Sequence, residues 1–231
     1  MRNCFLKFHR RGIFLLAGLL ALGGLESTPG EALINPLVRT IKFTAYDPND
    51  NSKAIGVLVR SDANAVQLVQ PNSAPWGGPA VSVPAGTYVL DVAGLPPQDG
   101  HPQSVGLARA GSDYSLGIFH FDPNEGTWTP VLPIADPNAP ASIATANTPN
   151  GPVVYVGDRG NQPIKRYNYS GNSFLYGGTV EPNFTTGAHP ITVDHSGNLY
   201  YVSPCGAQVY KYGPNSGAPA LVISNTGSNP V

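Results

Sequence analysis

Three oxygen-bearing side chains, spread along the sequence, could together hold a divalent cation. They lie near the ends of short apolar segments, at Asp91, Asn147 and Asp194. Carboxylate and amide oxygens are ligands that Ca²⁺ prefers, and a bound cation can polarise a carbonyl group and activate a water molecule. The alternative is structural, because Asp and Asn also stabilise turns by bonding nearby backbone N–H groups. The three residues are therefore weak candidates for a metal site.

Other signatures of catalysis are incomplete or missing in the sequence. Asp47–Asn51 alternates oxygen side chains like the start of a calcium loop, but it lacks the Gly at position six and the Glu at position twelve, so a polar turn explains it. No two histidines have the i,i+2 or i,i+4 spacing of a metal pair; after the N-terminal segment they are His101, His120, His189 and His195. There is no Gly-x-Ser-x-Gly, Walker loop, dinucleotide fingerprint or CxxC. These motifs leave the catalytic residues unknown, and we expect no cofactor.

Tyrosines suggest binding rather than catalysis. Six of the tyrosines in the C-terminal part of the chain are candidates: Tyr167, Tyr169, Tyr200, Tyr201, Tyr210 and Tyr212. A tyrosine offers an apolar face and a polar tip to a carbohydrate or peptide, although packing inside the fold is the alternative. With 13 Lys+Arg against 14 Asp+Glu and no basic block, the chain has no electrostatic footprint for nucleic acid.

An internal repeat must position these side chains. Four alternating segments recur at intervals of 45 to 52 residues, at Val66–Val69, Ile118–Phe121, Ile164–Tyr167 and Val209–Tyr212. Three of them are followed two residues later by a Pro-Asn pair, which begins at Pro71, Pro123 and Pro214. Pro presets the second position of a β-turn and Asn tolerates the third, so each pair indicates a reversal of the chain.

Four strands accompany each repeat. The 27 Gly and 24 Pro exclude long helices and favour short strands joined by turns. In the second repeat the strand candidates are Tyr88–Val92, Ser104–Arg109, Leu116–Phe121 and Trp128–Leu132. This spacing is typical of a β-propeller blade, whereas a β-sandwich does not explain the recurring turn. We predict an all-β propeller of about four four-stranded antiparallel blades, at residues 38–83, 86–132, 140–177 and 189–224, with 226–231 starting a further blade.

The last repeat resembles a known family. Its pattern is a proline, an apolar pair, Val-Asp, a turn ending in Gly-Asn and an aromatic strand, from Pro190 through Asp194 and Gly197-Asn198 to Tyr200-Tyr201. It is similar to the repeat of NHL-type secreted bacterial propellers, and gluconolactonase-like (SMP-30) propellers share much of it. The resemblance is close over 188–224 and recognisable over 140–176. It implies that the Asp of the Val-Asp step lies in the turn after the inner strand. A lactonase-type ligand would precede it, where this sequence has His189-Pro190-Ile191.

The first 32 residues have the pattern of a secretory signal peptide. A positive segment ending at Arg10-Arg11 precedes the uncharged run Gly12–Leu25, and Gly30 and Ala32 fit a cleavage site. The run is shorter than the roughly 20 residues that a membrane span needs. We expect a secreted or periplasmic protein with no membrane span in the mature chain, exported by the general or the twin-arginine route. Cys205 is then the one remaining cysteine, most simply a buried one.

These patterns favour a function in binding. Most propellers of the resembled family have six or more blades, so we expect these four repeats to form an incomplete ring, with a closed ring of four blades as the alternative. We predict an exported, non-enzymatic binding or scaffold module that contacts a protein, peptide or carbohydrate at its rim loops or central funnel. The alternative is a metal-dependent gluconolactonase-like hydrolase, with calcium as its cofactor. The resemblance favours turn roles for Asp91 and Asp194 over this alternative.

Overall fold

The fold is all-β. The computed structural model describes residues 38–47, 50–60, 65–69, 80–122, 124–135, 140–158, 162–180, 190–194, 196–203, 208–213 and 216–224. These residues form sixteen strands and no helix, and none of them belongs to a helix that could span a membrane. The predicted signal peptide, Cys205, His189 and His195 lie outside the described residues.

The strands form four antiparallel sheets of four strands, each in simple chain order. Blade 1 contains β1 (Val38–Asp47), β2 (Asp50–Arg60), β3 (Ala65–Val69) and β4 (Ala80–Ser82). Blade 2 contains β5 (Thr87–Gln98), β6 (His101–Ala110), β7 (Asp113–His120) and β8 (Thr127–Ile134). Blade 3 contains β9 (Pro140–Thr148), β10 (Gly151–Asp158), β11 (Ile164–Ser170) and β12 (Ser173–Val180). Blade 4 contains β13 (Ile191–Val193), β14 (Leu199–Ser203), β15 (Gln208–Tyr212) and β16 (Ala220–Ile223).

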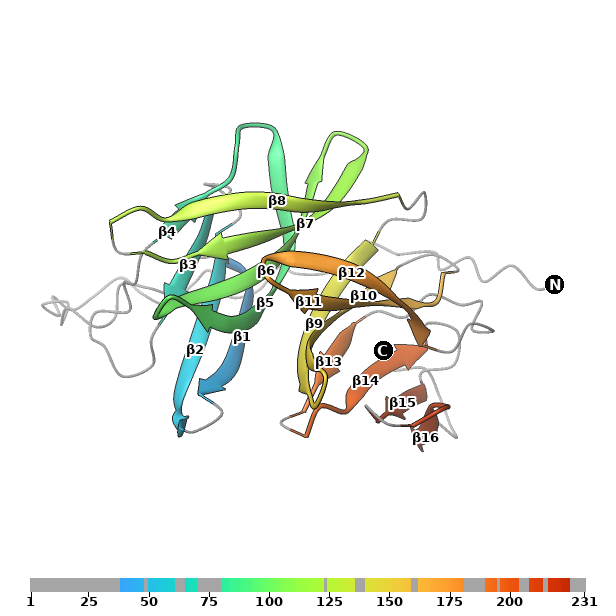
Figure 1. Ribbon diagram of the computed structural model, residues 1–231. Helices are drawn as coiled ribbons and strands as arrows, with labels where there is room; N and C mark the ends of the chain where they lie inside the picture. The colour runs from blue at the N-terminus through green and yellow to red at the C-terminus, as the bar shows by residue number, and fades with distance from the viewer. Residues whose placement is uncertain are drawn as a thin grey trace, which may run out of the picture.

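The sheets are arranged as blades around a common centre. The first strands of the sheets lie toward the middle of the molecule in Figure 1, and the fourth strands β4, β8 and β16 lie toward its outside. The inner strands are neighbours in chain order, with β5 between β1 and β9, and β9 beside β13. The β-propeller architecture predicted from the repeat is therefore confirmed for the four blades that the described residues form.

The apolar core lies between the blades. Blades 1 and 2 share Val66, Val81, Val89, Val92, Phe119 and Phe121. Blades 2 and 3 share a larger cluster that includes Leu95, Val105, Leu107, Ile118, Ile143 and Val156. Blades 3 and 4 share Tyr155, Ile164, Ile191, Leu199 and Tyr201, among others. Blades 2 and 3 each bury both faces in this way, which explains why their strands lack the simple alternation of a half-exposed sheet.

The first hairpin of blade 2 is longer than the sequence predicts. The apolar runs end at Val92 and resume at Ser104, yet β5 continues to Gln98 and β6 starts at His101. Asp99 (φ 50°) and Gly100 (φ 79°) form the turn, and both adopt the left-handed conformation that an Asp-Gly hairpin turn requires. β5 contains two consecutive prolines, at 96 and 97, and because proline is unfavourable within a strand, the sequence does not predict a strand there. They are accommodated where the β5–β6 register shifts, between Leu95 and Gln98.

Candidate functional site

A polar cleft of about 260 Å³ lies between blades 2 and 3. Its lining comes mostly from one face of blade 2, with one residue from the β11–β12 turn of blade 3: Gln98, Asp99, Gln103, Ile118, His120, Thr127, Thr129, Val131 and Asn172. Thr127, Thr129 and Val131 alternate along β8, so their side chains point to the same face of the sheet. Ile118 also belongs to the core shared by the two blades, so the cleft continues that core toward solvent.

The long β5–β6 hairpin explains why this end of the blade is polar. Along β6, burial is complete from Gln103 to Ala108 but only partial at His101 and Pro102. The hairpin therefore carries blade 2 beyond the apolar contact with blade 3. Side chains at this end can remain hydrated, and the lining changes there from aliphatic to amide, hydroxyl and imidazole groups.

Gln103 is the centre of the hydrogen-bond network beside the cleft. Its Nε2 donates to Gln98 Oε1 at 2.8 Å and lies 3.3 Å from His120 Nδ1. Its Oε1 accepts from the Tyr169 hydroxyl of blade 3 at 3.1 Å. Gln103 is only 3% exposed, so this side chain positions its neighbours rather than reaching solvent itself.

The network sets the proton position on His120. The Gln103 Nε2 group can only donate, so the 3.3 Å contact is a hydrogen bond when His120 Nδ1 is the acceptor, and the neutral ring then carries its proton on Nε2. The Tyr169 hydroxyl also lies 2.9 Å from Asn172 Oδ1, so its single proton serves two amide oxygens. Tyr169 thereby links Gln103 of blade 2 to Asn172 of its own blade.

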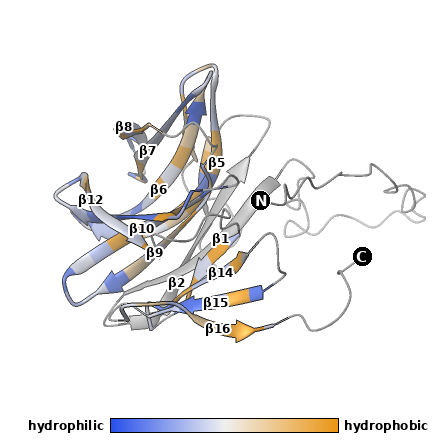
Figure 2. Ribbon diagram, turned by 90° about the vertical axis from the view of Figure 1, so that its right-hand side faces the viewer, coloured by the Kyte–Doolittle hydropathy of each residue, from blue (hydrophilic) through white to orange (hydrophobic). Residues whose placement is uncertain are grey.

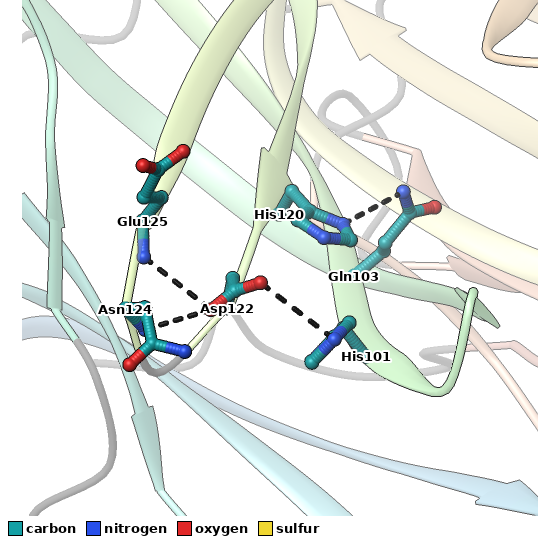
Figure 3. Close-up of polar contacts among 6 residues, drawn as sticks. All are labelled: His101, Gln103, His120, Asp122, Asn124 and Glu125. Carbon is teal, nitrogen blue, oxygen red and sulfur yellow. Dashed lines mark hydrogen bonds and ion pairs between the residues drawn. The ribbon is translucent and has the colours of Figure 1, made fainter.

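A second polar group, His101 with Asp122, stands next to His120. His101 Nε2 lies 3.6 Å from Asp122 Oδ2, and the rings of His101 and His120 meet edge to face with centroids 5.4 Å apart. Figure 3 shows the two groups side by side, with Asp122 also accepting from the backbone of Asn124 at 2.7 Å and of Glu125 at 3.3 Å. The Asn124 N–H is the main cause that lowers the pKa of Asp122, and the Glu125 N–H and the two imidazoles act in the same direction. Asp122 thus stabilises the β7–β8 turn and faces His101 as an anion.

The proximity of His101 and His120 has no signal in their spacing. They are 19 positions apart and on different strands, but Gln103 of β6 is paired with His120 of β7, which brings the two rings together. Among the described residues no group of three or more His, Cys, Asp or Glu side chains is arranged to hold a metal ion. The sequence analysis missed this cleft, and the Asp99-Gly100 pair was the signal for the hairpin that builds it.

Asp91 does not lie in a turn, so the turn expectation for it is wrong. It is in the middle of β5, where it is 4% exposed. Its Oδ1 accepts from Val92 N at 2.9 Å and its Oδ2 accepts from Ile143 N of β9 at 2.8 Å. The physical reason is a register shift between Val89 and Asp91, which turns the carboxylate toward blade 3. Asp91 joins two blades by a charge-assisted bond to the backbone.

Asp194 and Asn147 have separate surroundings. Asp194 follows β13 and accepts from Ser196 N (2.9 Å), Asn198 N (2.9 Å), Asn198 Nδ2 (2.8 Å) and the Tyr200 hydroxyl (3.1 Å). Desolvation acts to raise its pKa, but these bonds outweigh it and hold the pKa below its ordinary value. Asn147 is exposed near the end of β9. It lies four residues from Ile143, about 13 Å along the strand from the Asp91 contact. The structure does not bring the three candidates together.

Most of the tyrosines pack inside the fold. Tyr167 and Tyr201 are buried, and Tyr201 stacks on Tyr210 with an interplanar angle of 15°. The Tyr169 hydroxyl reaches the cleft network, through Gln103 and Asn172.

No protein-family model matches the sequence, and none of the curated proteins matches it. Among solved structures, a gluconolactonase from Xanthomonas campestris is similar with a TM-score of 0.50 at 14% identity, over 75% of this chain and 60% of that one. Virginiamycin B lyase from Staphylococcus aureus gives 0.49 at 14% identity, over 80% and 55%. The calcium-binding protein regucalcin from Agrobacterium tumefaciens gives 0.46 at 15%, over 78% and 58%. The chain thus spans less than two thirds of each of these structures. The likeness to the gluconolactonase supports the propeller fold, and the fold alone.

Proposed function

We propose that this protein is an exported β-propeller binding module that takes a small polar ligand in the cleft between blades 2 and 3. The observation that carries the proposal is the cleft itself, where hydrogen-bonding side chains from two blades converge above an apolar floor. Binding sites commonly have this composition, with a few placed polar groups in a concave surface. We also propose that the chain is related to the NHL-type and gluconolactonase-like propellers that its last repeat resembles.

A metal-dependent hydrolase is the alternative that the sequence left open, and the fold is compatible with it. We place it second, because two of its three candidate ligands already bond to the protein. Asp91 accepts from two backbone N–H groups, and Asp194 accepts from its own turn. The test below can detect this alternative, because it predicts hydrolysis of a sugar lactone that depends on calcium.

The test is a thermal-shift screen on residues 33–231. The compounds are neutral and charged sugars, short peptides, amino acids and a sugar lactone, each with and without Ca²⁺. Thr129→Ala removes a cleft hydroxyl, and Thr192→Ala on β13 is the matched exposed control outside the cleft. We expect at least one compound to raise the melting temperature of the wild type and the control but to act more weakly on Thr129→Ala. If no compound separates these variants, the cleft is not a binding site, and calcium-dependent hydrolysis of the lactone would favour the alternative.

A further inference from the structure

Resting on the proposed binding function, we infer that the ligand of the cleft is one neutral sugar ring, free or at the end of an oligosaccharide. The cleft offers separate hydrogen-bond donors and acceptors above an aliphatic floor. This combination suits a ring that carries hydroxyl groups on its edge and C–H groups on its face.

The charges of the lining select against anionic ligands. Of the nine lining side chains, Asp99 is a carboxylate and none is Lys or Arg. Asp122 adds a second negative charge close to His101, next to the cleft. A phosphate, sulfate or uronate would meet these carboxylates without a permanent cation to offset them. A neutral ligand avoids this cost.

The hydrogen-bond network leaves a definite set of groups for the ligand. Gln103 uses both ends of its amide on protein groups, so it holds other side chains in place. Within the described residues, His120 Nε2, Gln98 Nε2 and Asn172 Nδ2 have no protein acceptor, so all three can donate to a ligand. Thr127, Thr129 and Asp99 supply acceptor oxygens. A hydroxyl group both donates and accepts, so neighbouring sugar hydroxyls can satisfy both kinds of group.

The floor and the size of the cleft fit a single ring. Ile118 and Val131 form the aliphatic part of the lining, on which the C–H face of a sugar can pack. The volume of about 260 Å³ is below the roughly 300–1,000 Å³ of sites for drug-sized molecules. One ring can therefore be enclosed, and any further residues of an oligosaccharide must extend into solvent.

An extended peptide is disfavoured at this site. Peptides that bind to a sheet usually add a strand to a free edge by backbone hydrogen bonds. The outer strand here is β8, and it contains Pro130 and Pro133, which have no N–H to donate. Peptide binding is consequently an outcome that the experiment must be able to detect, rather than the expected one.

The experiment is isothermal titration calorimetry of residues 33–231 with glucose, galactose, N-acetylglucosamine and cellobiose. Glucuronate and an alanine tetrapeptide are titrated in parallel. The cleft variants are Thr129→Val, which keeps the side-chain shape, and Asn172→Gly, which keeps the backbone at φ 64°. Thr192→Val is the control on β13. We expect at least one neutral sugar to bind, glucuronate to bind more weakly than glucose, and each cleft variant to lose about 3- to 10-fold in affinity while the control is unchanged.

The outcomes separate this inference from the proposed function. If glucuronate or the peptide binds with sensitivity to the cleft variants and no neutral sugar does, the ligand class is wrong and the binding site stands. If a sugar binds with equal affinity to the wild type and to both cleft variants, the sugar site lies elsewhere and the inference is overturned. If none of these ligands binds, the sugar inference fails, and the broader thermal-shift screen decides the binding function separately. Tyr169→Phe adds a check on positioning, because it should weaken sugar binding through Asn172 and Gln103 without touching the ligand.

Discussion

Substitution of Asp91 tests whether its carboxylate holds blades 2 and 3 together. The side chain is 4% exposed, and each of its oxygens accepts a backbone N–H, from Val92 in its own strand and from Ile143 in β9. Asp91→Ala leaves both N–H groups buried without this acceptor. Asp91→Asn keeps one acceptor oxygen but turns an NH₂ group toward the other N–H.

The expected losses follow from these two bonds. A hydrogen bond to a charged group contributes about 1.5–3 kcal/mol, and a buried unsatisfied N–H costs about 1–3 kcal/mol. We therefore expect the free energy of unfolding to fall by about 3–5 kcal/mol for Asp91→Ala, with some relief from relaxation and water entry. For Asp91→Asn we expect a loss of about 2 kcal/mol. For a chain of this length, 1 kcal/mol corresponds to about 2–4 °C in melting temperature, so Asp91→Asn should melt about 4–8 °C lower.

Urea unfolding at pH 7, followed by circular dichroism in EDTA, measures these losses. Asp113→Asn is the control, because Asp113 is exposed and its hydrogen bond to the Ser112 hydroxyl is long at 3.3 Å. It should change stability by less than about 0.5 kcal/mol. If Asp91→Asn in EDTA is as stable as the wild type, the interblade role is refuted. If the variant differs from the wild type only when calcium is present, Asp91 is a metal ligand instead.

Three further predictions concern other parts of the fold. Gly117→Ala should cost about 1–3 kcal/mol and change the tryptophan fluorescence, because a Cβ there overlaps the Trp128 ring, whereas Gly217→Ala, with open space around it, should be neutral. Asp194→Ala should lower the melting temperature at pH 7. Since the folded-state pKa of Asp194 is lowered, its contribution is full above the unfolded pKa of about 3.9 and is lost as pH falls through the folded value, so a difference that does not shrink below about pH 4 would contradict this role. We expect the exposed apolar strand β16 (Figure 2) to promote self-association, so Val222→Lys should lower the apparent mass in light scattering, and an unchanged apparent mass would contradict this role of the strand.

The repeat was sufficient to predict the blades because turn chemistry and strand pattern recur together. The Ile164–Tyr167 and Val209–Tyr212 segments lie in β11 and β15, the third strands of their blades. The pattern could not predict how long the strands of each blade are. The prolines at 96 and 97 interrupt the apolar run in β5, and only the register shift at that point lets the strand continue.

The candidate site was less predictable, because its residues are related by pairing and not by spacing. His120 meets Gln103 across the β6–β7 ladder, and Tyr169 arrives from the next blade, 66 positions further along. For Asp91 the sequence suggested a role that the structure does not show. Its sequence neighbours resemble those of Asp194, but a one-residue register shift buries it in the strand and gives it a different role.

The interface between blades 2 and 3 combines stability and binding in one surface. Asp91 and Gln103 are buried polar residues on the face of blade 2 that packs against blade 3, and each is satisfied by blade 3, through Ile143 N and the Tyr169 hydroxyl. Asp91 is paired with Leu107 on β6, four residues or about 13 Å along the strand from Gln103. Two polar contacts at separate positions along the strands fix how blade 3 lies against blade 2. Aliphatic packing alone does not fix this orientation. Because Asn172 approaches the cleft from blade 3, loosening the Asp91 contact should widen the cleft and weaken ligand binding at a distance.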